Sequence, residues 1–143
     1  MYKYVTYISE QSYVLSEKVI EDLLVHCRDA NEARGITGLL IFFQGVFTQY
    51  LEGPEKEIKE VYEKILKDSR HQRVIELSSG YSEQRYYGDW CMAYHKLSND
   101  EFVKITGYQE LDRDQFFTQP GNKVKHPGIE LLESFIQGLH FNE

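Results

Sequence analysis

The segment "GITGLLIFFQGVFTQYLEGP", residues 35–54, decides the fold because it contains two apolar runs joined by a turn signal. Residues 36–43 and 46–53 are rich in β-branched and aromatic side chains, a composition typical of β-strands. Gln44 and Gly45 stand between the two runs, and a short glycine-containing link of this kind favours a β-hairpin. We therefore expect two adjacent antiparallel strands.

A polar residue interrupts the second run. Strand alternation places Phe47, Gln49 and Leu51 on one face. If the two apolar side chains face the helices, the Gln49 amide is buried with them, and a buried amide without hydrogen-bond partners costs roughly 1 to 3 kcal/mol. The sequence therefore predicts that other polar groups lie near Gln49.

Helical and strand patterns on both sides of this hairpin complete the order of elements. The expected elements are a strand at 2–9, a helix from Ser16 to Gly35, the hairpin, a helix within 53–71, and strands near 73–80 and 89–96. The order β-α-β-β-α-β-β predicts an α+β, ferredoxin-like fold, in which two helices cover one face of a mixed sheet.

Three polar side chains are expected to converge under the two helices. Tyr7 shares a strand face with Val5, and the inward stripe of the first helix ends on Asn31. Together with Gln49 they offer a phenol and two amides, a set that suits a planar heterocycle with imide-like edges. Taken singly, a strand tyrosine is usually packing, a strand glutamine is often an edge residue, and an asparagine near a helix end is often a cap. The pattern alone therefore predicts a polar pocket and no particular ligand.

The last third of the chain reads as an extension. We expect a core over residues 1–95 and a helical cap over 96–143, in which Ser98 begins a helix. A later helix carries an apolar stripe from Ile129 through Leu132 and Ile136 to Leu139. We expect these C-terminal helices to cover the other sheet face. The alternative is that the stripe joins two protomers in a homodimer or higher homo-oligomer.

Composition narrows the class of protein. The 143 residues suit one domain, and a formal charge of −7, from 16 basic and 23 acidic residues, argues against nucleic-acid and membrane-surface partners. No signal-type segment or bilayer-length apolar run is present, which favours a cytoplasmic protein. Cys27 and Cys91 form no CxxC pair, and the five histidines show no metal-site spacing, so we predict no metal.

Five residues and four short motifs carry a family resemblance. The residues are Tyr7, Asn31, Gln49, Trp90 and Met92. The motifs are "GITGLLIF" at 35–42, "FTQYLEGP" at 47–54, "DSRH" at 68–71 and "WCM" at 90–92. Over residues 2–95 the chain resembles BLUF domains, blue-light sensors that bind FAD.

The resemblance implies a photochemical function without enzymatic catalysis. It implies that FAD binds non-covalently between the two helices, with FMN or riboflavin as possible substitutes. It implies that Tyr7 donates an electron and then a proton, and that Gln49 reverses its hydrogen bonds to give a red-shifted state. Trp90 and Met92 share strand parity and compete for the position beside Gln49. The signal is expected to pass to an unidentified partner protein in trans.

The resemblance also implies a set of cofactor contacts. We expect Leu23, Leu24 and Ile65 to sandwich the ring, and Ala30 replaces an asparagine found in many members, so that one ring contact is expected to be missing. Asp68 is expected to contact the ligand or to orient Arg70. Lys64, Arg70 and His71 match family positions near the ribityl and phosphate groups. For Lys64 an ordinary solvated helix end is an equally good reading, and Cys27 also reads as a core residue. The full set of expected cofactor-binding residues is Tyr7, Leu23, Leu24, Cys27, Asn31, Gln49, Lys64, Ile65, Asp68, Arg70, His71 and Met92.

The sequence also allows three other interpretations. "QGVFTQ" resembles the phosphate loop of acylphosphatases, but Gln49 stands where that loop has its arginine, and a neutral amide cannot replace a guanidinium. "HCR" around Cys27 shares only two letters with the reactive-cysteine motif of LOV sensors. A non-photoactive flavin-binding or protein-interaction module is the remaining alternative, disfavoured because buried polar groups without a ligand are costly.

Overall fold

A computed structural model describes residues 1–85 and 92–106. In chain order the elements are β1 (Tyr2–Gln11), α1 (Glu17–Arg34), β2 (Thr37–Phe43), β3 (Val46–Gly53), α2 (Glu55–Lys67), β4 (His71–Ser82), β5 (Ala93–Lys96) and α3 (Asn99–Thr106). The predicted order β-α-β-β-α-β-β is confirmed. Trp90, Cys91 and the stripe at 129–139 lie outside the described residues, and the division into a core and a cap stays a prediction.

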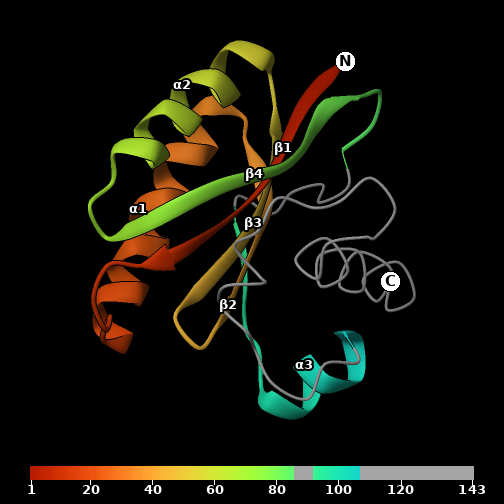
Figure 1. Cartoon of the computed structure of the whole chain (residues 1–143). Helices are drawn as coiled ribbons and strands as arrows, with labels where there is room; N and C mark the ends of the chain where they lie inside the picture. Colours follow the sequence, from red (N-terminus) through yellow and green to blue (C-terminus); the bar gives the residue numbers. More distant parts are fainter. Residues whose placement is uncertain (86–91, 107–143) are drawn as a thin grey trace.

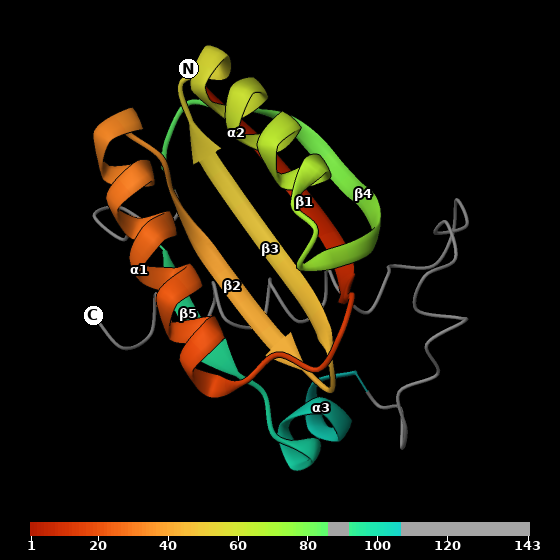
Figure 2. The same cartoon turned by 90° about the vertical axis from the view of Figure 1, so that its left-hand side faces the viewer.

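The strands form one mixed sheet in the order β4-β1-β3-β2-β5. β1 pairs antiparallel with both β3 and β4, whereas β2 pairs antiparallel with β3 and parallel with β5. Figures 1 and 2 show α1 and α2 side by side on the same face of this sheet, α1 toward β2 and β5 and α2 toward β1 and β4. The predicted α+β, ferredoxin-like architecture is therefore confirmed.

Local signals fix the element ends as the sequence predicts. The Ser16 hydroxyl accepts a hydrogen bond from the Val19 amide at 3.2 Å, which caps α1 at its N-terminus. Gly35 ends α1 with a φ of 70°, a left-handed conformation that glycine adopts without a Cβ penalty. Gln44 and Gly45 have φ values of 48° and 80°, so the hairpin turn has the positive angles of a type I′ turn.

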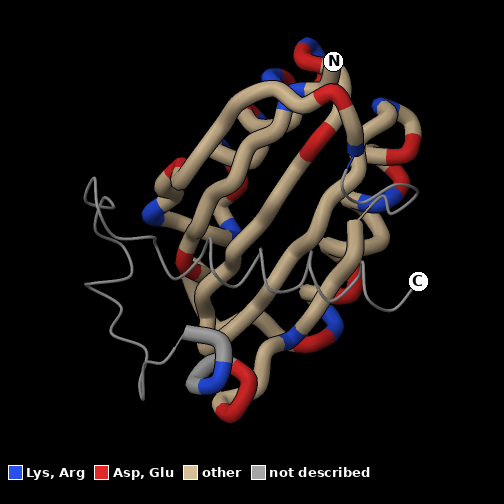
Figure 3. Tube along the Cα trace, turned by 90° about the vertical axis from the view of Figure 1, so that its right-hand side faces the viewer, with Lys and Arg blue, Asp and Glu red and all other residues tan. Residues whose placement is uncertain are grey.

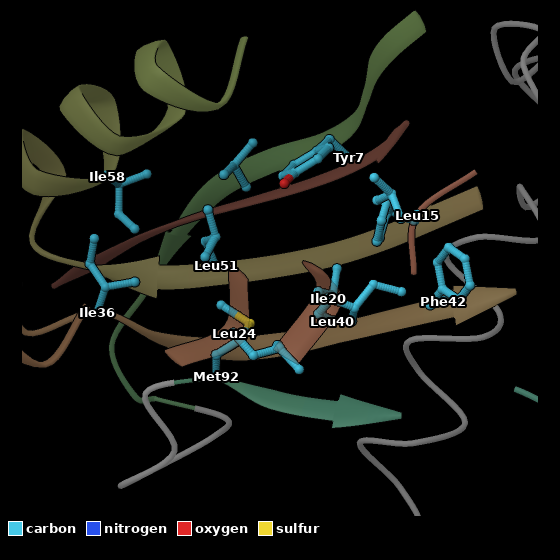
Figure 4. Close-up of a cluster of buried hydrophobic side chains, with 12 residues drawn as sticks. Tyr7, Leu15, Ile20, Leu24, Ile36, Leu40, Phe42, Leu51, Ile58 and Met92 are labelled. Atoms are coloured by element: carbon cyan, nitrogen blue, oxygen red, sulfur yellow. The ribbon is translucent and has the colours of Figure 1, made fainter. Parts of the chain in front are cut away.

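The helices and the sheet enclose one main apolar cluster (Figure 4). Val5, Leu51 and Ile58 are among its most buried members, with 2%, 1% and 2% of their surface exposed. Tyr7 and Met92 also belong to this cluster. Two side chains with chemical functions are therefore part of a packed core, which limits their freedom of movement.

Charge is sparse in the two central strands, as the tube in Figure 3 shows. β2 and β3 hold a single charged residue between them, Glu52, which is 1% exposed. The hydroxyls of Thr37 and Tyr50 donate to its two carboxylate oxygens at 3.0 and 3.1 Å. By strand parity Glu52 lies on the face opposite to Gln49, so this polar group is separate from the site described below. Within the described residues, no helix combines the length and apolarity needed to cross a bilayer.

Candidate functional site

A cavity of ≈ 230 Å³ lies between α1, α2 and the sheet. Aliphatic side chains form much of its wall, and cationic side chains from both helices, Arg34 and Lys64, also line it. The lining residues are Tyr7, Leu23, His26, Cys27, Ala30, Asn31, Arg34, Leu40, Phe47, Gln49, Leu51, Val61, Lys64, Ile65, Asp68, Arg70 and His71. The cavity thus lies where the sequence predicted a polar pocket.

A chain of hydrogen bonds runs along the sheet side of the cavity. β1 and β3 pair Tyr7 directly opposite Gln49, and the Tyr7 hydroxyl donates to Oε1 of Gln49. Nε2 of Gln49 donates to Sδ of Met92 at 3.4 Å. Gln49 and Tyr7 are 6% and 3% exposed, so the amide has the buried partners that the sequence required. Trp90 and Met92 were the two residues expected to compete for the position beside Gln49. Met92 contacts Gln49, and Trp90 lies outside the described residues.

Burial controls the ionisation of the Tyr7 phenol. Removal from water raises the pKa of Tyr7 well above its ordinary value of 10, and the nearby Cys27, Tyr62 and Asp68 raise it further. The Tyr62 ring lies 5.7 Å from that of Tyr7 and the His71 ring 6.4 Å. Tyr7 therefore keeps its proton throughout the neutral range.

The second amide, Asn31, lines the cavity from α1. It occupies the last full turn of α1, is 4% exposed, and its backbone carbonyl accepts from the amide of Ile36 at 2.9 Å. Leu23, Val61 and Ile65 supply apolar walls from the two helices. Two buried amides across an apolar slot suit a planar ring with a hydrogen-bonding edge, so the residues present fit a flavin.

An ion pair orders the end of α2 at the cavity rim. The Asp68 carboxylate accepts from Nε and Nη2 of Arg70 at distances of 2.5–3.1 Å. The Arg70 guanidinium holds the pKa of Asp68 below its ordinary value, and Asp68 in turn raises the pKa of Arg70. Of the two readings left open for Asp68, orientation of Arg70 is the one that this geometry favours.

His71 joins α2 to β1. One ring nitrogen, Nε2, meets the Ile65 carbonyl, and the other, Nδ1, lies 2.9 Å from the Ser9 hydroxyl. A carbonyl only accepts, so Nε2 of His71 donates to it. His71 thus fixes the last turn of α2 against the strand that carries Tyr7.

Cys27 is half-buried in the cavity wall. Burial raises the pKa of its thiol, and the opposing effect of Arg70 is smaller. The thiol is therefore protonated at neutral pH and a poor nucleophile, which agrees with a packing role.

Most of the expected contact residues come together. Every one of the expected cofactor-binding residues lines the cavity except Leu24 and Met92. Leu24 is 7% exposed and packs in the main apolar cluster, because the turn of the helix directs it past the cavity. Met92 reaches the site through Gln49.

Several lining residues were not expected, although patterns in the sequence could have identified them. Phe47 and Leu51 share the strand face of Gln49, and Leu40 is paired with Gln49 across β2 and β3. His26 and Arg34 follow the helical spacing that also carries Leu23, Cys27, Ala30 and Asn31. The methyl group of Ala30 lines the cavity without a hydrogen-bonding group, as the replacement of asparagine implied.

Comparisons with known proteins agree with this geometry. The family model described as BLUF, "Sensors of blue-light using FAD", matches residues 2–93. The chain is 37% identical over 71 residues to the blue light- and temperature-regulated antirepressor BluF of Escherichia coli, an alignment that covers 50% of this chain and 18% of the relative.

Solved structures give the same fold. BlsA in its ground state superposes with a TM-score of 0.67 and 27% identity, over 90% of this chain and 98% of that one. The dark-state structure of the BLUF protein BlrB gives a TM-score of 0.73 at 22% identity, with 96% of each chain covered, which shows a shared fold. The chain thus spans less than a fifth of the curated relative's length but nearly the full length of both solved chains.

Proposed function

The chain belongs to the BLUF family, the sensors of blue light using FAD. We propose that it binds flavin in the α1–α2 cavity and converts light into a hydrogen-bond change at Gln49. The observation that carries the proposal is the link from the Tyr7 hydroxyl through the Gln49 amide to the Met92 sulfur. All three groups are buried, and the first two line the cavity.

The walls of the cavity support a role in holding the ring. Leu23 of α1 and Ile65 of α2 both line the cavity, and we assign the amide groups of Asn31 and Gln49 to the edge of the ligand. When bound, flavin supplies absorption of blue light and an excited ring that accepts an electron. The protein's own contribution is to hold the ring in place, exclude water and position one electron donor.

Tyr7 is the donor in this proposal. Its hydroxyl already points its proton at Oε1 of Gln49, so loss of an electron from the phenol and loss of that proton can be coupled. Gln49 then reverses its orientation or its tautomer, and the electron and the proton return to Tyr7, so that the net change is one of hydrogen bonding alone. The two ends of an amide differ in kind, so the two arrangements encode different networks of similar energy.

The size of the cavity bears on the choice of cofactor. At ≈ 230 Å³ it falls slightly below the ~300–1,000 Å³ usual for pockets that enclose a drug-sized ligand, so we propose that it takes the ring while the rest of a dinucleotide extends past the rim. Lys64, Arg70 and His71 also line the cavity, and we assign them to the ribityl and phosphate groups. FAD is the cofactor proposed, and FMN and riboflavin share the part that the cavity holds.

The signal is proposed to pass to another protein, with no catalytic step in this domain. BLUF domains are sensors, and the relative named above is an antirepressor, a protein that acts on a partner. The identity of the partner and the formation of a homo-oligomer stay predictions, as does the cytoplasmic location.

An absorption spectrum tests the function directly. Purified protein loaded with FAD is measured in the dark, immediately after blue light, and through recovery. We expect a flavin band that moves slightly to the red and returns. Bleaching to a near-ultraviolet species would indicate an adduct at Cys27 or simple photoreduction, and failure to take up flavin would refute the proposal.

A further inference from the structure

One long side chain of α1 reaches the start of β5. Nε of Arg28 donates to the backbone carbonyl of Met92 at 3.0 Å, across 64 residues of sequence. A guanidinium that donates to a carbonyl makes a charge-assisted hydrogen bond, which is stronger than one between neutral groups. This contact therefore anchors a backbone position, and it does so from the helix that also forms a wall of the cavity.

The backbone of Met92 lies just outside the paired part of the sheet, so a contact with Arg28 can help to fix its position. β5 is only four residues long, and its pairing with β2 begins at Ala93, opposite Leu39. Met92 therefore precedes the first paired residue, at the end of a short parallel ladder that is weak by itself. The Arg28 contact supplies a backbone hydrogen bond where the described sheet pairing has ended.

The side chain of Met92 makes the contact that matters for the site. Its sulfur accepts from Nε2 of Gln49 at 3.4 Å, and the residue is 3% exposed. Sulfur is a weak acceptor, so this bond alone holds neither partner firmly. The position of the sulfur depends on where the Met92 backbone is held, and the Arg28 contact helps to hold it.

Arg28 is also well placed along α1. It follows Cys27, which lines the cavity, and stands one turn before Asn31, whose buried side chain lines the cavity as well. α1 therefore contacts two parts of the site: it lines the cavity through Cys27 and Asn31, and it holds Met92, just before β5, through Arg28.

We propose that Arg28 is a positioning residue for the photoresponse: it holds the Met92 carbonyl against α1, keeps the sulfur on the Gln49 amide, and links any change at Gln49 to β5. The part of this proposal that concerns light rests on the function proposed above. The part that concerns Met92 is a statement about protein groups alone and is tested in the dark.

The chain offers a direct probe and a matched control. It contains two methionines, Met1 and Met92, so protein labelled with ¹³C-methyl methionine gives one resonance from the site and one from Met1, which is 83% exposed and serves as a reference. Lys96 and Glu17 also join β5 to α1, but through exposed side chains 4.0 Å apart. K96Q thus removes a positive charge between the same elements without touching the Met92 backbone.

R28Q is expected to shift or broaden the Met92 resonance, whereas K96Q leaves it in place. Recovery of the red-shifted state is expected to slow in R28Q by about threefold, the size appropriate to a partly exposed charge-assisted hydrogen bond, because the bond belongs to the arrangement to which the protein returns. R28K, which keeps the charge but changes the donor geometry, is expected to be intermediate.

A Met92 resonance that coincides with that of the wild type in R28Q, together with an unchanged recovery rate, would overturn the proposal. If R28Q releases flavin, the resonances of the flavin-free proteins are compared, since the contact needs no ligand. A wild-type protein without any light-induced shift would contradict the proposed function, and the comparison in the dark would still decide the role of Arg28.

Discussion

At the scale of single residues, the hydrogen bonds of Gln49 are unequal. Its carbonyl oxygen accepts from a buried phenol, whereas its amide nitrogen donates to a thioether sulfur at 3.4 Å. A thioether is a weak acceptor, so the nitrogen end gives up little when the amide turns. Reversal of Gln49 therefore changes mainly its hydrogen bond with Tyr7.

Replacement of Tyr7 by phenylalanine tests the assigned donor. Tyr7→Phe removes the hydroxyl and leaves the ring, so flavin uptake is expected to persist while the light-induced red shift falls to the limit of detection. The spectrum before and after blue light measures both. Tyr62→Phe is the matched control, because its ring lies 5.7 Å from Tyr7 and is only partly buried. A normal red shift in Tyr7→Phe would remove Tyr7 as the donor.

The raised pKa of Tyr7 leads to a prediction about pH. Burial favours the neutral phenol, so the amplitude of the red shift is expected to stay constant from pH 6 to about pH 9. The raised pKa of Tyr7 also lowers the stability of the folded protein at higher pH, because the unfolded chain loses the Tyr7 proton at about pH 10 and the folded protein does not. Stability is therefore lost as the pH rises above about 10, and Tyr7→Phe is expected to reduce that loss.

Urea unfolding at a series of alkaline pH values checks the second part of this prediction. The other tyrosines also ionise in the unfolded chain, so the informative quantity is the difference between wild type and Tyr7→Phe. Identical pH dependence of the two proteins would mean that Tyr7 does not titrate differently on folding.

At the scale of elements, the close approach of β2 to β3 depends on one glycine. A Cβ at Gly38 would press into the Tyr50 carbonyl oxygen and lie 3.1 Å from the carbonyl carbon and 3.3 Å from Cα of Leu51. All these atoms are backbone and cannot move aside alone. Gly38→Ala is therefore expected to destabilise the protein by about 3 kcal/mol, measured as the free energy of unfolding in urea.

Gly35→Ala provides the comparison for that prediction. Gly35 has a φ of 70°, but the nearest atom to its added Cβ is 3.8 Å away, so it tests backbone strain without a clash. Its cost is expected to be about 1 kcal/mol. If Gly38→Ala costs no more than Gly35→Ala, the packing of these two strands is looser than described.

Sequence patterns predict elements better than they predict contacts between them. Ser16, Gly35 and the Gln44-Gly45 turn mark boundaries because capping and turn chemistry act over a few residues, and the structure places the ends there. The contact of Arg28 with Met92 spans 64 residues and joins a side chain to a backbone atom. A local sequence pattern cannot predict such a contact. It also cannot predict that the Met92 side chain is buried beside Gln49.

At the scale of the whole molecule, the two helices are joined across the cavity at one end by charge. Nη1 of Arg34 lies 2.8 Å from carboxylate oxygens of both Glu57 and Glu60, so the last turn of α1 is tied to α2. Arg34 also lines the cavity and stands one turn after Asn31. At the other end of α2, His71 ties the helix to β1. The slot between the helices is therefore fixed by polar contacts at both ends.

Loss of the Arg34 contacts is expected to loosen this slot. Arg34→Gln keeps much of the side-chain length but removes the charge that both glutamates share, so bound flavin is expected to dissociate about threefold faster at low salt, an effect in the range of exposed ion pairs. Flavin fluorescence after dilution measures the rate. Because exposed charges are screened, added salt is expected to speed release from the wild type and to leave Arg34→Gln nearly unchanged.

Lys59 is the control for this last prediction because it belongs to α2, is exposed, and pairs with Glu55 of the same helix at 3.2 Å. Lys59→Gln therefore makes the same change in net charge without touching a contact between helices. If both variants release flavin at the same rate, the effect is one of overall charge. If only Arg34→Gln does so, and its release no longer responds to salt, the tie between α1 and α2 controls how long the chromophore stays bound.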